Sequence, residues 1–561
     1  YENCANSPFC IIACFDLKGN KNMEINVDKY GIANCFSVPL TEAIKDLNDG
    51  DTLVFENKEY HLFKDYSQER HIHFTNTDSF KNPKKYFGML IEDKKNFNIE
   101  GNGATLVIHG DICSLGMINC KNVNIDNLTI KYACPNCVEL KVLEKKGKTY
   151  RFSLPDSQLW YIDDSKKNTV VFFEQSPYTK KNYWEFRNDE NSYNGVYHGA
   201  DGNTVYRIPN QKGVFSGIKS MKRLSATELE IKYKKNKFFK VGDILTHQTN
   251  KNRNTCGIFF GECANVKSTN ITVNYMAGFG WLSQMCENIS FDHITFKGDK
   301  DHIVSSFADL IHICGCKGDV TITNSYFSHA HDDCINVHGS FMRFKEKIDD
   351  NTAVFEFVHH QQGGHKNFFP GDKAKFYRRT NLNELPGDFT VKSVVDDLEG
   401  KTCKVTFNET LPQNIGEKHL RQSNIVIENK SYCPNVEISD CVFTAIPTRD
   451  ILCTTSGKVR IHHNIFKHSQ MAHIFISDDS MFWYESGPVR DVEIYENKFL
   501  LSPSVYSKCP AILIKPITFG KMNSKVHENI TIRSNYFLVG RDVPIRAKGV
   551  TNLDIYSNTF N

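Results

Sequence analysis

The chain has almost no net charge of either sign, and this lack excludes several classes of partner. Its 68 Lys and Arg residues and 65 Asp and Glu residues leave a formal net charge of +3 over 561 residues. A protein that binds nucleic acid or an anionic membrane through its charge carries a strong basic excess. The sequence also has no apolar run long enough to span a bilayer. We therefore expect no nucleic-acid partner and no membrane span.

Cysteine pairs with the spacing of a zinc finger are also lacking, although the chain has 19 cysteines. No Cys-x-x-Cys pair is matched by a second one at such a spacing. We therefore expect no metal and no cofactor. Cysteine inside a strand-like pattern behaves as a small apolar residue, which predicts buried free thiols. This applies to Cys314, Cys316, Cys334, Cys441 and Cys453. For Cys4, Cys10 and Cys14 a local disulfide remains open.

A helical period of 3.6 residues is lacking, and a strand-like repeat stands in its place. Each copy alternates apolar and polar residues, turns at a polar residue and ends on an aromatic residue. Uninterrupted copies start 23 residues apart, at 436 and 459 and again at 530 and 553. Second short strands lie between copies, at 334–337, 451–454, 473–476 and 511–514. This pattern predicts an all-β protein with the fold of a parallel β-helix.

Two local features accompany the repeat. Asn464, Asn497, Asn535 and Asn558 share one position of it, which predicts a ladder of hydrogen-bonded amides from coil to coil. Near the N-terminus, residues 41–47 predict a short helix with Thr41 as its N-cap. A helix at this place would cover the exposed end of the first coil.

Two stretches, 133–250 and 340–432, interrupt the repeat with antiparallel-type strands. We interpret them as small β domains inserted into loops, a place where insertions wall a binding cleft. The predicted division is then a cap and first coils (1–132), a first insert (133–250), coils with an acidic cluster (251–339), a second insert (340–432) and C-terminal coils (433–561).

The acidic cluster lies within residues 331–339, where Asp332 and Asp333 are adjacent, and Asp309 lies 24 residues before Asp333. Aligned short strands place Asp309, Asp333 and Asp450 in one column, with Asp332 at the corner beside it. Coils stack about 4.8 Å apart, and carboxylates at that distance repel, which raises one pKa. Such a pair supplies the acid and the base of glycoside hydrolysis. The alternatives are a structural Asp ladder and a calcium site.

Other polar and aromatic side chains surround this cluster in the sequence. Histidine and asparagine hydrogen-bond sugar hydroxyls, and an aromatic ring beside carboxylates is a sugar-binding combination. For residues 477–487 an ordinary packed loop is the alternative. The predicted substrate-binding residues are His312, His331, Asn336, His338, Arg449, Asp450, Asp478, Trp483, Glu485 and Glu262.

Several of these stretches resemble glycoside hydrolase family 110, namely 275–280, 307–312, 331–339, 369–372 and 483–491. The resemblance runs from about 254 to 499 and implies a right-handed parallel β-helix with small β-barrel insertions. It further implies an exo-acting, inverting α-galactosidase that releases terminal α-1,3-linked galactose, as in blood group B or linear α-galactosyl glycans. The family's acidic residues map onto Asp309, Asp332 and Asp333.

The roles of the three aspartates follow from that resemblance only in part. We assign Asp332 and Asp333 to the activation of water and Asp309 to the protonation of the leaving oxygen. The carboxyls of an inverting pair stand roughly 6.5–9.5 Å apart, farther than neighbours in a straight column. Either Asp332 is therefore the base, or the acid is another residue, such as Glu262 or Glu485.

Two further functions stay open. A polygalacturonase-like endo-hydrolase, like a lyase, needs basic residues to hold acidic sugars, and only Lys317 and Arg449 are near the cluster in the sequence. A non-catalytic glycan-binding solenoid would not depend on Asp332 and Asp333. The start at Tyr1 and a glycan substrate predict an exported protein whose signal peptide has been removed. We expect a monomer or a homodimer.

Overall fold

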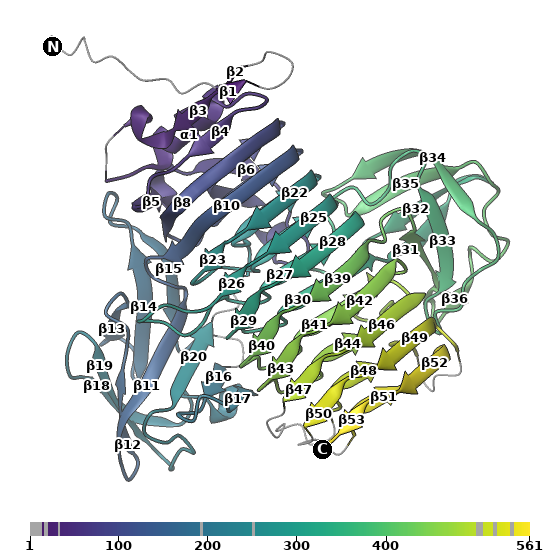
Figure 1. Cartoon of the computed structure of the whole chain (residues 1–561). Helices are drawn as coiled ribbons and strands as arrows, with labels where there is room; N and C mark the ends of the chain where they lie inside the picture. Colours follow the sequence, from purple (N-terminus) through teal and green to yellow (C-terminus); the bar gives the residue numbers. More distant parts are fainter. Residues whose placement is uncertain are drawn as a thin grey trace.

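The computed structural model describes residues 14–15, 21–31, 34–190, 195–248, 253–500, 509–519, 524–538 and 543–561. The strands form one long stack of coils, from the purple N-terminal end to the yellow C-terminal end (Figure 1). Two β inserts project from this stack on different sides, one blue and one green. Strands of successive coils pair in parallel, so the predicted parallel β-helix is confirmed.

Most coils contribute one strand to each of three faces, and within each face the strands of successive coils pair in parallel. The first face comprises β3 (Glu24–Asn26), β4 (Thr52–Val54), β8 (Lys95–His109), β10 (Lys121–Tyr132), β22 (Ala264–Thr269), β25 (Glu287–Asp292), β28 (Lys317–Thr323), β39 (Asn435–Ser439), β42 (Lys458–His462), β46 (Asp491–Tyr495), β49 (His527–Arg533) and β52 (Val550–Tyr556). The second comprises β5 (Glu59–Phe63), the ends of β8 and β10, β23 (Thr272–Val273), β26 (Thr295–Phe296), β29 (Tyr326–Ser328), β40 (Val442–Thr444), β43 (Ile465–Lys467), β47 (Lys498–Leu500), β50 (Tyr536–Leu538) and β53 (Thr559–Phe560).

The third face carries the residues of greatest interest. It comprises β7 (Lys84–Glu92), β9 (Cys113–Ile118), β21 (Ile258–Gly261), β24 (Trp281–Gln284), β27 (Ile311–Cys314), β30 (Ile335–Ser340), β41 (Ile451–Thr454), β44 (Ile474–Ile476), β48 (Ile512–Ile514) and β51 (Ile545–Ala547), with β6 (Gln68–His71) antiparallel to β7 at one edge. Successive side chains of a strand point to opposite faces. Ile311 and Ile335 therefore pack in the core, while His312 and Asn336 point outward, in register with one another.

The predicted asparagine ladder is present. The Nδ2 of Asn464 donates to the Oδ1 of Asn497, that of Asn497 to Asn535, and that of Asn535 to Asn558, each at 3.0 Å. Beside it, the aromatic residues that end each copy point inward and form a stack with ring centroids 4.6 to 5.7 Å apart. Its members are Phe296, Phe327, Phe443, Phe466, Phe499, Phe537 and Phe560. From coil to coil, the amides thus hydrogen-bond one another and the rings stack on one another.

The N-terminal helix is present, but its predicted start is wrong. Helix α1 runs over Ser37–Asp46 with Phe36 at its N-cap, where no side chain caps the helix. Thr41 lies inside the helix, and its hydroxyl donates to the carbonyl oxygen of Ser37 at 2.8 Å. A threonine in a helix can bond the carbonyl four residues earlier as readily as it can cap, so this residue type alone does not fix the helix start.

The first insert folds into two antiparallel sheets over a core of its own. Seven strands lie in the order β17 (Val205–Ile208), β16 (Gly195–His198), β20 (Ile244–Gln248), β11 (Cys137–Lys146), β12 (Thr149–Ser153), β19 (Glu228–Tyr233) and β18 (Ile218–Arg223). The other sheet has β13 (Leu159–Asp163), β14 (Thr169–Gln175) and β15 (Asn182–Arg187).

The second insert is a closed six-stranded barrel with a separate apolar core. Its strands lie in the order β31 (Met342–Lys347), β32 (Thr352–Glu356), β35 (Thr402–Phe407), β34 (Phe389–Asp397), β33 (Lys373–Arg378) and β38 (Ile425–Asn429). A small hairpin joins β36 (Lys418–His419) to β37 (Gln422–Ser423).

Near the N-terminus, β1 (Cys14–Phe15) pairs with β2 (Lys21–Asn22).

The cysteines predicted to be buried thiols are so: Cys314, Cys316, Cys334, Cys441 and Cys453 are free and buried. Cys4, Cys10 and the side chain of Cys14 lie outside the described residues, and so does the disulfide considered for them. Within the described part of the chain, no helix has the length and apolar character needed to cross a membrane.

Candidate active site

A pocket of about 190 Å³ opens on the third face of the β-helix, and it brings together residues from five separate parts of the chain. The contributing parts are the third-face strands of the β-helix with the corners before them, the loop after β6, the first insert, the segment before β21, and β45 (Glu485–Ser486) with the loop before it. Its lining consists of Asn76, Arg207, Arg253, Phe279, Asp309, His312, Asp332, Asp333, Asn336, Arg449, Leu452, Trp483 and Glu485.

The acidic column forms only in part as predicted. Ile311 pairs with Ile335, which places Asp309 beside Asp333, and the amide of Leu310 donates to the carbonyl of Asp333 at 3.1 Å. Ile335 pairs with Ile451, however, so the residue beside Asp333 is Arg449 and not Asp450. A slip of one residue reverses the direction of a strand side chain.

Asp450 consequently points away from the pocket. It is fully buried and bonds the hydroxyl of Ser469 at 2.5 Å and the Nδ1 of His473 at 2.6 Å. Its predicted place in the column is wrong, because the strand that follows it, β41, was aligned one residue out of register with β30. A buried carboxylate with two such partners supports the fold and lies outside the pocket lining.

Arginines pair with the two adjacent aspartates at the corner before β30. The Nε and Nη2 of Arg449 contact the two oxygens of Asp333 at 2.8 and 2.7 Å, a bidentate pair. The Nη2 of Arg207, from the first insert, lies 2.9 Å from Asp332, and the Nη1 of Arg253 lies 3.9 Å from it. Asp332 is the more exposed of the two, with 21 % of its side chain accessible against 3 % for Asp333.

The environments of the three aspartates push their pKa values in different directions. Burial raises the pKa of Asp309 well above its usual range, and the charges of Asp332 and Asp333 add to this. Burial also raises the pKa of Asp333, against the opposing charge of Arg449. Burial acts likewise on Asp332, but Arg207, Arg253 and Arg449 outweigh it and lower the pKa of that carboxyl. The pocket thus holds carboxyls whose pKa values are pushed apart, as acid–base catalysis needs.

The wall opposite the aspartates combines an aromatic ring and an acceptor. Trp483 is 38 % exposed, and its ring centroid lies 4.2 Å from that of His359 of the second insert. Glu485 follows on β45, which pairs antiparallel with the end of β30, and the Nδ2 of Asn76 donates to its Oε1 at 3.0 Å. An accessible ring face beside polar acceptors suits a sugar ring.

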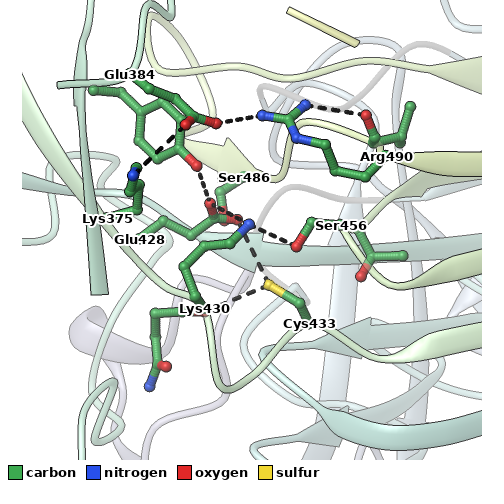
Figure 2. A network of polar contacts seen from close by, with 12 residues as sticks. Lys375, Glu384, Glu428, Lys430, Cys433, Ser456, Ser486 and Arg490 are labelled. Atoms are coloured by element: carbon green, nitrogen blue, oxygen red, sulfur yellow. Dashed lines mark hydrogen bonds and ion pairs between the residues drawn. The ribbon is translucent and has the colours of Figure 1, made fainter. Parts of the chain in front are cut away.

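A buried polar network supports β45 from the side away from the pocket. Figure 2 shows Glu428 and Lys430 of the second insert gathered around Ser486. Lys430 Nζ lies 2.6 Å from the hydroxyl of Ser456 and 3.5 Å from Glu428, and the hydroxyl of Tyr377 donates to Glu428 at 2.9 Å. This network joins the second insert to the β-helix at Ser456, whereas β45 itself is held by its pairing with β30.

Four predicted substrate-binding residues besides Asp450 lie outside the pocket lining. His331 faces the first insert, where its Nε2 bonds the hydroxyl of Thr246 at 2.7 Å. His338 is buried behind His312. Asp478 is fully buried, and Glu262 is exposed at a corner before β22, with φ 53°. His338 lies within β30 and the other three lie near strand ends, but none of the four side chains lines the pocket.

Sequence reasoning missed five lining residues, of which Asn76, Arg207 and Arg253 carry polar groups. Arg207 lies 125 residues before Asp332 in the chain, inside an insert whose docking the repeat does not encode. The expectation that few basic residues lie near the aspartates is therefore wrong. Two of the three arginines are nevertheless paired with Asp332 and Asp333, so they balance carboxylates of the protein itself.

Among the described residues, the one group of His, Cys, Asp or Glu side chains close enough to share a metal ion lies outside the pocket. The Nε2 atoms of His71 and His73 both lie 2.9 Å from the same carboxylate oxygen of Glu399 in the second insert. These hydrogen bonds already join the three side chains, and they tie the barrel to the strand edge at β6.

Comparison with known proteins connects this architecture to a set of enzymes. Residues 352–420 match the family model described as GLAA-B beta-barrel domain II, and they lie in the second insert. The chain is 29 % identical to alpha-1,3-galactosidase A of Streptomyces avermitilis over 95 % of this chain and 87 % of that protein. It is 30 % identical to alpha-1,3-galactosidase A of Bacteroides thetaiotaomicron over 90 % of this chain and 85 % of that protein. It is 26 % identical to alpha-1,3-galactosidase B of Phocaeicola vulgatus over 98 % and 92 %.

Proposed function

Because the chain belongs to glycoside hydrolase family 110, we propose that its pocket removes terminal α-1,3-linked galactose from glycans, with inversion at the anomeric carbon. The expectation of an α-galactosidase glycoside hydrolase is confirmed by the relatives. The linkage, the exo-action and the roles of single residues belong to the proposal. The observation that carries it is one small pocket lined by Asp309, whose pKa is raised, and by Asp332, whose pKa is lowered.

Asp332 is the base and Asp309 the acid in this mechanism. The Asp332 carboxylate, kept ionised by Arg207 and Arg253, takes a proton from a water molecule, which attacks the anomeric carbon. Asp309 gives its proton to the glycosidic oxygen as the bond to that oxygen breaks. One water is consumed, and galactose of inverted configuration and an alcohol are released. Asp333, paired with Arg449, adds the negative charge that raises the pKa of Asp309.

The column supports Asp332 rather than Asp333 as the base. Asp309 and Asp333 lie on adjacent coils, closer than the carboxyls of an inverting pair. Asp332 belongs to the corner beside the column and is turned toward Arg207 of the first insert. A pocket of about 190 Å³ suits one sugar ring at the end of a chain and supports exo-action.

The test is galactose release from an α-1,3-galactosyl disaccharide and from the fucosylated blood group B trisaccharide, with NMR to follow the first anomer formed. We expect the β anomer first, and a loss of about 10²- to 10⁴-fold in kcat/KM for Asp309→Asn and Asp332→Asn. Asp319→Asn, at an exposed residue of β28, is the matched control and should retain activity. Release of the α anomer first, or from neither substrate, would sink the proposal.

Galactosyl fluoride separates the two roles, because fluoride leaves without a proton. Asp309→Asn should hydrolyse α-galactosyl fluoride at close to the wild-type rate, whereas Asp332→Asn should not. The opposite result would exchange the roles. Release of galacturonic acid from a digalacturonide would instead favour the polygalacturonase-like alternative.

A further inference from the structure

A chain of hydrogen bonds leads from Asp309 into the protein, behind the pocket. The Oδ2 of Asp309 lies 2.9 Å from the Nδ1 of His312, and the Nε2 of His312 lies 2.9 Å from the Nε2 of His338. The Nδ1 of His338 lies 2.6 Å from the carbonyl oxygen of Gly339. The side chains of His338, His312 and Asp309 are 0, 1 and 4 % exposed, so water does not complete this chain.

When both imidazoles are neutral, the carbonyl at the inner end fixes the direction of every bond. A carbonyl oxygen only accepts, so the Nδ1 of His338 carries a proton and donates it. In a neutral imidazole the other nitrogen is then an acceptor, so the Nε2 of His312 must donate to His338. The Nδ1 of His312 is left as an acceptor, and the atom facing it is a carboxyl oxygen of Asp309. That contact is a hydrogen bond only if Asp309 carries the proton.

Counting protons gives the same result. The chain contains three contacts, and each needs one proton. Two neutral imidazoles supply two, so the third lies either on Asp309 or on one of the two rings, which makes an imidazolium of His312 or of His338. The neutral arrangement suits this place because separated charges are costly where water is excluded. Around Asp309 stand the carboxylates Asp332 and Asp333, which oppose its ionisation, and the cation Arg253, which favours it.

We propose that His338, anchored on the Gly339 carbonyl, acts through His312 to keep the catalytic proton on Asp309 in the resting enzyme. The meaning of this proton for catalysis rests on the acid role proposed above. His312 and His338 are thus positioning residues. Burial and the neighbouring His338 lower the pKa of His312 well below its usual value, which agrees with a neutral ring in the middle of the chain.

The carboxylate Glu485 opposes the ionisation of Asp309, but it would also favour an imidazolium at His338. Its Oε1 lies 3.5 Å from the Nε2 of His338 and would stabilise an imidazolium there. Asn76 already donates to the same oxygen at 3.0 Å and offsets part of its negative charge.

The Gly339 carbonyl, which anchors His338, is held in place by the strand pairing of Gly339 with Ser486. A side chain at Gly339 would come within 2.5 Å of the Ser486 hydroxyl.

Two substitutions at His338 test the chain, with infrared difference spectroscopy of the carboxylic C=O band as the readout. Wild type should show a protonated carboxyl at neutral pH that Asp309→Asn abolishes. His338→Gln places an amide oxygen near the former Nε2, so it still accepts from His312 and should keep the band. His338→Leu removes the acceptor, which lets His312 turn its proton toward Asp309. The pH at which the band disappears should then fall by about one unit.

The same shift should appear in the alkaline limb of kcat/KM with the disaccharide, and should be absent with galactosyl fluoride. Nitrogen-15 NMR of the wild-type histidines requires no variant and should show His312 protonated on Nε2 and His338 on Nδ1. An imidazolium at His312 or His338, no carboxyl band in wild type, or an unchanged band in His338→Leu would each overturn the proposal. If the band behaves as expected but galactose release fails, the proton assignment stands and the acid role falls.

Discussion

Two polar columns run along the same β-helix, and they differ in what their members do to one another. The column of Asn464, Asn497 and Asn535 consists of neutral amides, each a donor and an acceptor at once. The column of Asp309 and Asp333 stacks like charges on adjacent coils, next to Arg449. The spacing between coils is the same in both, so the chemistry of the side chain alone makes one column stabilising and the other reactive.

The difference shows how a repetitive scaffold acquires a site. Identical amides bond one another and the backbone carbonyls of the neighbouring coil, so no charged group is needed to satisfy them. Stacked carboxylates leave repulsion and desolvation that other parts of the chain must offset. Here the balancing groups are Arg449 from the next coil, Arg207 from the first insert and His312 beside Asp309. These groups offset the repulsion and desolvation to different degrees at each aspartate, and the differences appear as the pKa shifts that catalysis needs.

The largest expected effect comes from removing the cation of the acidic column. Arg449→Met leaves the carboxyl of Asp333 buried without its bidentate partner, which costs about 3–5 kcal/mol of stability for a buried pair. Galactose release should also fall, because Asp333 no longer holds its charge beside Asp309. Urea unfolding and kcat/KM measure the two effects.

Arg460→Met is the matched control, since Arg460 pairs with the half-exposed Asp491 in the C-terminal coils at 2.8 Å. An exposed pair contributes about 0–1 kcal/mol, and activity should be unchanged. If both variants lose similar stability, the contrast between the two regions is wrong.

The sequence was enough for the scaffold but not for the pocket. The alternation around Ile311 and Ile335 predicted both the strands and their register, because a parallel β-helix repeats one local pattern. The insertion between Asp333 and Asp450 broke that repeat, and the alignment slipped by one residue there. Arg207 was not foreseen because its approach to Asp332 depends on how an insert docks, which no local pattern records.

The neutral ladder offers the next largest effect. Asn497→Ala removes an oxygen that accepts from the backbone N and the Nδ2 of Asn464, both at 3.0 Å, and an amide that donates to Asn535. An unsatisfied buried group costs about 1–3 kcal/mol. We expect a loss of about 2–3 kcal/mol in urea unfolding with normal kcat/KM at low temperature. A drop in kcat/KM while the protein remains folded would contradict the separation of ladder and site.

The smallest effect is a change in how the free energy of unfolding depends on pH. It concerns Asp478, which lies near Glu428, a residue labelled in Figure 2. Neither of its oxygens has a hydrogen-bond partner among the described residues, and burial, with Glu428 nearby, raises its pKa well above the usual range. A carboxyl with a raised folded pKa contributes stability that is complete below the unfolded pKa of about 3.9 and is lost as pH rises toward the folded value. Asp478→Asn should therefore become more stable relative to wild type with rising pH, by up to about 1.4 kcal/mol per pH unit in that window.

Urea unfolding at a series of pH values above 4 measures this slope. Asp292→Asn supplies the opposite sign, because hydrogen bonds from Asn324, Thr323 and His293 outweigh burial and lower the pKa of Asp292 to about 2. Its contribution is complete above the unfolded pKa of about 3.9 and is lost as pH falls toward 2. This variant, measured in a second series between about pH 2 and 4, should therefore lose stability relative to wild type as pH rises. Parallel curves for Asp478→Asn and wild type would mean that Asp478 is ionised in the folded protein. The network around Glu428 would then have to supply a cation to it.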